Sequence, residues 1–304
     1  MKLARLCAVV ACATLIFPLF GCYERRNFHG YNSFDFWILN HTFINWLKRC
    51  RHFNRYAETI KTRIAGGTLA GTNLFPYQVG LLLLQAPKVY QCGGALISQN
   101  YVLTAAHCLL RATKVRAFVG SNLFADAATS TMYETNRSAF HIYEQYSYGG
   151  YDDIGLIYFK NPIQLSEKVQ IIPLAKKFMI QSALEGETVT TSGWGRTSDN
   201  TTTFDIELYY IDVPVIPYQR CACYYLPGLV RERNHICTDG KGGRGSCDGD
   251  SGGPLTYLYN NVTYLIGLTS FGSASGCEIQ YPSVFTRITT YLSWIEKKTG
   301  IKSA

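Results

Sequence analysis

The sequence predicts an all-β protein, a barrel or a sandwich, that ends in one α-helix. After residue 63 the apolar residues come in short runs broken by Gly, Asn, Ser and Pro, which is typical of short strands joined by turns. The last stretch differs, because apolar residues recur at helical spacing from Ile288, two lysines occupy the final turn and Gly300 follows. We therefore expect a C-terminal amphipathic helix.

The clearest apolar runs predict strands at residues 77–84, 90–97, 115–119, 155–159, 188–193 and 264–270. With 304 residues, 47% of them hydrophobic and 16% charged, the chain can bury a sizeable core, which excludes disorder as the default. No run of about 20 apolar residues follows the N-terminus, which excludes a polytopic membrane protein.

The basic charge of the chain is concentrated at its N-terminus. Residues 1–63 hold 10 Lys and Arg against 3 Asp and Glu, leaving 19 against 18 for residues 64–304, so the net charge of +8 does not indicate a nucleic-acid surface. Lys2 and Arg5 precede an apolar stretch that ends at Phe20, which predicts a signal peptide over residues 1–21 and a secreted protein. An uncleaved membrane anchor is the alternative, but this stretch is short for a bilayer that needs about 20 residues.

Residues 22–63 are rich in aromatic and basic side chains and have no clear period. A regulatory pro-segment and a retained non-coding sequence are both open interpretations. Secretion would also make glycosylation acceptors of Asn40, Asn136, Asn200 and Asn261.

Three motifs contain residue types suited to nucleophilic catalysis: Thr-Ala-Ala-His-Cys around His107, Asp-Ile-Gly-Leu-Ile from Asp153, and Gly-Asp-Ser-Gly-Gly-Pro around Ser251. In this order they resemble the chymotrypsin/trypsin family of serine endopeptidases, over residues 64 to about 300. The resemblance implies two antiparallel six-stranded β-barrels, at about 64–173 and 174–285, followed by a helix at about 287–299. The domain of residues 64–304 would then carry catalysis in the cleft between its barrels.

The resemblance assigns the catalytic roles. A serine hydroxyl is a weak nucleophile at neutral pH, so Ser251 needs His107 as an adjacent base. Asp153, rather than the neighbouring Asp152, would hold the imidazole in the required tautomer. The amides of Gly249 and Ser251 would form the oxyanion hole, because glycine permits the backbone conformation that such a turn needs.

The family resemblance extends to activation. The Arg63–Ile64 junction, followed by Ala-Gly-Gly, is similar to the site at which zymogens of this family are cut. The freed amine of Ile64 would pair with Asp250, because a buried carboxylate without a partner costs several kcal/mol. A trypsin-like protease is the implied activator, and protein inhibitors are possible partners besides protein or peptide substrates.

The resemblance also indicates a specificity pocket. Its base would be Gly245, which has no charge for Lys or Arg, and the other lining residues would be Ser270, Phe271, Gly272 and Ser283. We therefore expect cleavage after large apolar or aromatic residues. A trypsin-like or broad specificity is the alternative, since a carboxylate such as that of Glu278 could reach the pocket. The glycine spacing here is similar to that of arthropod chymotrypsin-like and collagenolytic (brachyurin-like) enzymes.

Eleven cysteines favour an oxidising compartment. The family implies three disulfides: Cys92–Cys108, Cys221–Cys237 and Cys247–Cys277. Cys223 is then left over, either free or bound to Cys22 or Cys50 of the N-terminal segment.

We expect no metal or cofactor, since the loop of residues 121–143 offers only Asp126 and Glu134 as acids. A catalytically inactive family member that acts as a binding module is the competing functional class.

Overall fold

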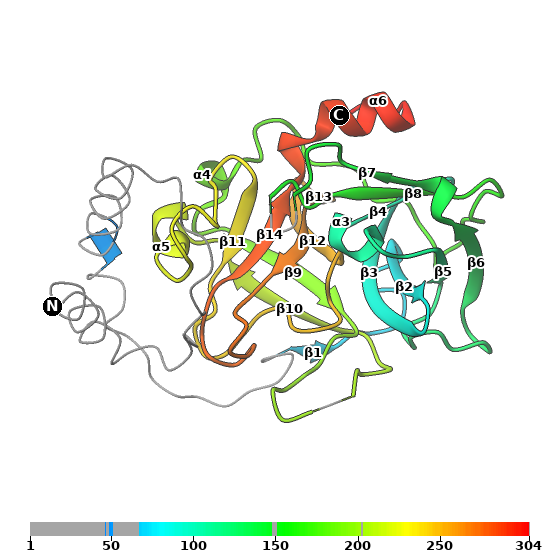
Figure 1. The fold of residues 1–304 in the computed structure, drawn as a ribbon, viewed down its shortest axis with the longest axis horizontal. Helices are drawn as coiled ribbons and strands as arrows, with labels where there is room; N and C mark the ends of the chain where they lie inside the picture. Colours follow the sequence, from blue (N-terminus) through cyan, green and yellow to red (C-terminus); the bar gives the residue numbers. More distant parts are fainter. Residues whose placement is uncertain (1–45, 47–48, 51–66, 148–150, 202, 304) are drawn as a thin grey trace, which may run out of the picture. The chain divides into compact units, whose positions relative to one another are not determined.

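Two antiparallel sheets of seven strands each form the body of the protein in the computed structural model (Figure 1). The structure describes residues 46, 49–50, 67–147, 151–201 and 203–303, and the statements below concern these residues. The predicted signal peptide, most of the predicted pro-segment and the Arg63–Ile64 junction lie outside them. No helix in the described ranges has the length and apolarity needed to span a membrane.

The first sheet is ordered β6-β5-β2-β3-β4-β8-β7. Apolar side chains alternate along its strands, so that Val79, Leu81 and Leu83 of one strand all point into a single core. The strands are β2 (Gln78–Gln85), β3 (Lys88–Ser98), β4 (Tyr101–Thr104), β5 (Lys114–Val119), β6 (Thr131–Asn136), β7 (Phe140–Ile142) and β8 (Gly155–Tyr158).

The second sheet is ordered β1-β10-β9-β12-β13-β14-β11. Its core contains Leu255, Leu268 and Phe285, which are fully buried. The strands are β1 (Thr68–Leu69), β9 (Thr188–Gly193), β10 (Tyr209–Pro214), β11 (His235–Thr238), β12 (Pro254–Tyr259), β13 (Val262–Phe271) and β14 (Ser283–Arg287).

The predicted fold class is confirmed, and each sheet has one more strand than the six expected. The additional pairings involve short edge strands: β7 has three residues and β1 has two. β1 precedes the first sheet in the sequence but pairs with β10 of the second, where Thr68 lies opposite Tyr210. A two-residue strand has no alternating pattern, so sequence periodicity could not reveal it.

Helices are short and lie at the ends of strands. They are α3 (Ala106–Leu109), α4 (Gln181–Leu184), α5 (Tyr218–Ala222) and α6 (Leu292–Thr299), with 3-10 turns at Arg137–Ala139 and Ile288–Thr290. The predicted C-terminal helix is confirmed, although its first turn is the 3-10 turn and its α-helical part begins at Leu292. Gly300, with φ of +75°, ends it in the left-handed conformation that glycine adopts without strain.

Candidate active site

His107 lies on α3, which directly follows β4 of the first sheet. Its Nδ1 is 2.8 Å from Oδ2 of Asp153, and its backbone amide donates to the other carboxylate oxygen at 2.9 Å. Asp153 itself precedes β8 and is 2% exposed. One carboxylate thus fixes both the ring and the backbone of the histidine.

The second sheet also holds Asp153. The Ser270 hydroxyl donates to Oδ2 at 2.6 Å, and the Thr286 hydroxyl donates to the backbone carbonyl of Asp153 at 2.8 Å. Burial acts to raise the pKa of Asp153, but the charge and hydrogen bonds of His107 and the hydrogen bond of Ser270 outweigh burial and lower it. For His107, burial acts to lower the pKa, and the attraction and hydrogen bond of Asp153 raise it above its ordinary value.

Ser251 lies in the glycine-rich turn before β12, against the first sheet. Its carbonyl accepts a hydrogen bond from the Gly93 amide at 2.7 Å and lies 3.7 Å from Sγ of Cys108, the neighbour of His107. The turn can approach this closely because residue 252 is glycine: a Cβ there would lie 2.1 Å from Oγ1 of Thr104. The side chains of Ser251 and His107 share no hydrogen bond among the described contacts, and such bonds commonly tighten only when substrate is bound.

The amides of Gly249 and Ser251 have no acceptor among the described hydrogen bonds. Gly249 has φ of +98°, and a Cβ on it would lie 2.9 Å from the Phe204 ring and 3.0 Å from Cα of Gly195. Only glycine fits this conformation and space. Two amides left without partners beside Ser251 can donate to an oxyanion that forms there.

Asp250 is a buried carboxylate, 3% exposed. Its two oxygens accept hydrogen bonds from the amides of Gly195, at 2.7 Å, and Cys247, at 2.9 Å. Burial raises its pKa to about 6, and the two amides only partly oppose this increase. No cation pairs with it among the described residues, and Ile64, its predicted partner, lies outside them.

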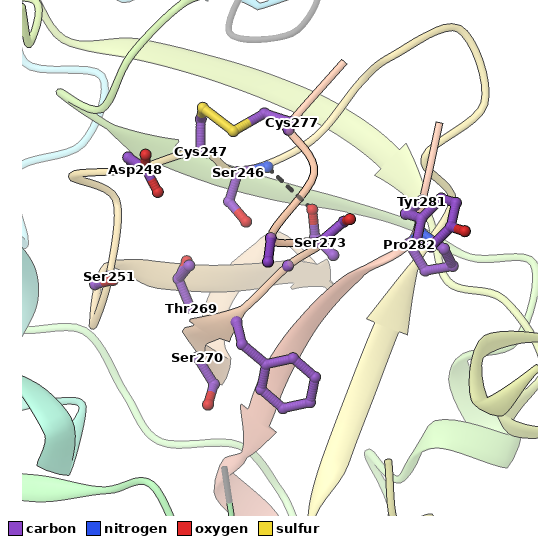
Figure 2. Close-up of a pocket in the computed structure, with 15 residues that line it drawn as sticks. Ser246, Cys247, Asp248, Ser251, Thr269, Ser270, Ser273, Cys277, Tyr281 and Pro282 are labelled. Carbon is purple, nitrogen blue, oxygen red and sulfur yellow. Dashed lines mark hydrogen bonds between the residues drawn. A yellow bond between two sulfur atoms is a disulfide. The ribbon is translucent and has the colours of Figure 1, made fainter. Parts of the chain in front are cut away.

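A pocket opens beside Ser251 (Figure 2). Four of the five predicted pocket residues line it, namely Ser270, Phe271, Gly272 and Ser283. Gly245, expected at the base, is not among its lining residues: it lies against Ser283, whose Oγ would be 2.4 Å from a Cβ at position 245.

Two described acids near the pocket, Asp248 and Glu278, interact with other groups. Asp248 lines the pocket, but its side chain is 70% exposed and lies 3.4 Å from Arg196. Glu278 is not a lining residue, and its carboxylate accepts hydrogen bonds from the amide of Asp199 and the hydroxyl of Ser198. Ser283 also lines the pocket, and its uncharged hydroxyl accepts a hydrogen bond from the Ser246 amide at 3.1 Å.

Four disulfides join described cysteines: Cys50–Cys223, Cys92–Cys108, Cys221–Cys237 and Cys247–Cys277. Cys92–Cys108 links β3 to the helix of His107, and Cys247–Cys277 links the Ser251 turn to the pocket wall. Cys223, for which two partners were open, pairs with Cys50. Asp126 and Glu134, the acids considered for a calcium loop, are engaged with Thr129 and with Lys114 and Arg116.

Sequence reasoning missed a network around Asp152. This residue has φ of +56°, which is uncommon for a residue other than glycine. Its Oδ1 accepts hydrogen bonds from the side-chain amide Nδ2 of Asn234 and from the Tyr291 hydroxyl, both at 2.8 Å. The pair of aspartates at 152 and 153 was the available signal, but Asn234 and Tyr291 are too distant in sequence to be linked to it.

Comparisons with known proteins agree with this geometry. The trypsin family model matches residues 64–295. Brachyurin of Leptuca pugilator is 39% identical over 240 residues, covering 78% of this chain and 99% of its own length. Collagenase of Hypoderma lineatum is 36% identical over 246 residues, covering 80% and 90%. Human chymotrypsin-like elastase family member 1 is 34% identical over 249 residues, covering 80% and 95%.

A solved structure of HL collagenase superposes with a TM-score of 0.70 at 36% identity, covering 78% of this chain and 99% of that one. Both the sequence and the arrangement of the sheets are therefore shared with proteases of one family. The chain belongs to the trypsin family of serine endopeptidases, with the chymotrypsin fold.

Proposed function

We propose that the protein hydrolyses peptide bonds with Ser251 as nucleophile, His107 as general base and Asp153 as the group that orients His107. Ser251 Oγ attacks the scissile carbonyl while His107 accepts its proton, and the Gly249 and Ser251 amides stabilise the resulting oxyanion. His107 then donates the proton to the leaving amine as the C–N bond breaks, which leaves an acyl-enzyme on Ser251. Water attacks the acyl carbon while His107 accepts its proton, and His107 returns that proton to Ser251 Oγ as the acid is released. The observation that carries the proposal is the pairing of His107 with the buried Asp153, next to a serine whose turn offers two unpaired amides.

Replacement of the nucleophile tests this mechanism. Ser251→Ala should keep the fold and lower turnover of a peptide substrate by several orders of magnitude, because the oxyanion donors alone give little catalysis. An organophosphonate should label the wild-type serine and leave the variant unlabelled. Near-normal turnover by the variant would contradict the mechanism, and an unlabelled, inactive wild type would favour a non-catalytic binding module.

We further propose cleavage after Phe, Tyr, Leu or Met. The uncharged base beside Ser283 cannot compensate Lys or Arg for lost hydration, whereas it gains about 25 cal/mol for each Å² of apolar surface that it buries. Matched peptides that differ only in Phe or Arg before the scissile bond give the test, as kcat/KM. A preference for Arg would overturn the specificity.

The last part of the proposal is that the protein is secreted as a zymogen and activated by cleavage after Arg63. The buried Asp250, with its pKa raised to about 6, is a site that the freed Ile64 amine would stabilise. Arg63→Gln should give a secreted precursor that a trypsin-like protease cannot activate. Full activity of the uncut chain would reject this, and N-terminal sequencing of the secreted protein would distinguish signal cleavage from membrane anchoring.

A further inference from the structure

We propose that Asp199 and Glu278 form a clamp that positions the wall of the specificity pocket. The clamp rests on the proposed function, since it acts on binding at that same site. Neither carboxylate belongs to the lining of the pocket, so both are positioning residues.

The two acids exchange hydrogen bonds with each other's backbone. The Asp199 carboxylate accepts the amides of Cys277, at 2.7 Å, and Glu278, at 3.1 Å. In return, the Glu278 carboxylate accepts the amide of Asp199 at 2.9 Å and the hydroxyl of Ser198 at 3.1 Å. Hydrogen bonds to carboxylates are stronger than those between neutral groups, so these three amide bonds and one hydroxyl bond fix one segment against the other.

The backbone of the wall is shaped for this contact. Gly276 lines the pocket with φ of +134°, and a Cβ on it would lie 2.4 Å from Oδ2 of Asp199. Glycine therefore allows Asp199 to approach the wall and reach the next two amides. Residues 272–282 contain no strand or helix, so their conformation depends on such tertiary contacts.

The clamp connects this wall to the loop that begins at Gly195. At its start, Gly195 donates to the Asp250 carboxylate, and the next residue, Arg196, donates its amide to the carbonyl of Asp248 at 2.8 Å. The loop is thus fixed near the nucleophile and reaches over to the wall. Without the clamp, Cys277 would keep only the disulfide to Cys247 as a described attachment to this side of the site.

A wall that is less ordered should weaken binding of the substrate side chain more than it slows the chemical step. The bonds of His107, Asp153 and Ser251 do not involve either acid. Losing binding that is equal in the ground state and the transition state raises KM and leaves kcat unchanged. We therefore expect Asp199→Ala and Glu278→Ala each to raise KM for a Phe peptide amide about tenfold, with kcat within about twofold.

The experiment compares these variants in the activated protein with three controls. Asp199→Asn and Glu278→Gln retain a side-chain oxygen and should recover part of the loss. The double alanine variant should be little worse than either single one, because the residues act as a unit. Glu296→Ala removes an acid from the exposed face of α6 and should leave KM unchanged.

Indole, as a competitive inhibitor, measures the pocket directly and should bind about tenfold more weakly to the alanine variants. An alkyl organophosphonate with no aromatic group should label their Ser251 at the wild-type rate. Wild-type KM and indole affinity in both alanine variants, or a fall in kcat with KM unchanged, would overturn the clamp. Failure of the wild type to react with the organophosphonate would instead refute the proposed function.

Discussion

At the scale of single residues, Asp152 is held in a conformation that usually costs about 1–3 kcal/mol. Hydrogen bonds from Asn234 and Tyr291 stabilise it there, and the next residue is Asp153. Asn234 directly precedes β11 and Tyr291 follows β14, so both donors come from the second sheet. They therefore help to hold the Asp153 carboxylate in place for His107, which belongs to the first sheet.

Substitutions at Asp152 can separate its conformation from its hydrogen bonds. Asp152→Gly keeps the left-handed backbone and loses the side-chain bonds, and we expect kcat to fall about tenfold because small displacements of catalytic groups are costly. Asp152→Asn retains both properties and should stay within about threefold of the wild type. Steady-state kinetics on a peptide amide give the comparison, and equal kcat for the Gly variant and the wild type would show that the bonds do not position Asp153.

The base of the pocket offers a second test at this scale. Ser283→Asp should place a carboxylate in the pocket, where it can accept the Ser246 amide as the hydroxyl does, and raise kcat/KM for Arg relative to Phe by on the order of 10². Gly245→Asp is the control, because its Cβ would collide with Oγ of Ser283 at 2.4 Å and its φ of +152° is unfavourable for other residues. That variant should lose stability instead of gaining Arg specificity. If Ser283→Asp left the ratio of kcat/KM for Arg and Phe peptides unchanged, residue 283 would not lie at the base of the specificity pocket.

The sequence could indicate residues in local motifs, such as His107 and Ser251, because their neighbours are part of the pattern. It could not indicate Asn234, Asp199 or the true orientation of Glu278. These residues gain their roles from loops that meet only in the folded chain. An exposed acid in a loop has the same local pattern whether it faces a pocket or accepts backbone amides.

At the scale of elements, α3 is a helix of four residues without a side-chain N-cap bond. Helices of this length are not stable alone, so tertiary contacts must hold α3 and its His107 in place. Cys108 of α3 is bonded to Cys92 of β3, which attaches the helix to the first sheet.

Two disulfides of equal span allow this contribution to be measured. Cys92–Cys108 and Cys221–Cys237 both join residues 16 apart, so removing either pair by alanine substitution should lower the free energy of unfolding by about 3 kcal/mol. Only the first removal should also lower kcat, because only that bond holds the helix of His107. Denaturant unfolding and kinetics on both double variants give the result, and equal kcat values would mean that other contacts suffice to hold α3.

Six strands could be predicted from their apolar runs, namely β2, β3, β5, β8, β9 and β13, and α6 could be predicted from its helical spacing. The other strands were not predicted: β1, β7 and β4 are very short, β6 is polar, and β10, β11, β12 and β14 have no apolar run clear enough to stand out. These segments form strands because neighbouring strands of the folded sheet pair with them. Their own residues therefore carry no local pattern that predicts a strand.

At the scale of the whole molecule, the uncut chain carries a buried acid whose pKa affects folding. The pKa of Asp250 is about 6 in the fold and 3.8 in the unfolded chain, so the folded state binds its proton more tightly. The resulting stability is complete below about pH 4 and is lost as pH rises to about 6, a total of roughly 3 kcal/mol at about 1.4 kcal/mol for each pK unit.

Urea unfolding of the precursor between pH 4 and pH 7.5 measures this loss. Asp250→Ala should lack that part of the pH dependence, and the activated protein should lose less stability, because the Ile64 amine would favour the charged carboxylate. Identical pH profiles for the precursor and the Asp250→Ala variant would contradict the assignment.

The Cys50–Cys223 disulfide gives the molecule a further property. Both cysteines are buried, at 4% and 5% exposure, and Trp46 donates to the carbonyl of the adjacent Ala222 at 3.3 Å. A cut after Arg63 falls between the two bonded cysteines, so it would give two chains that stay joined by this disulfide. The N-terminal piece would then remain at a fixed effective concentration, however far the enzyme is diluted, as long as the Cys50–Cys223 bond is intact.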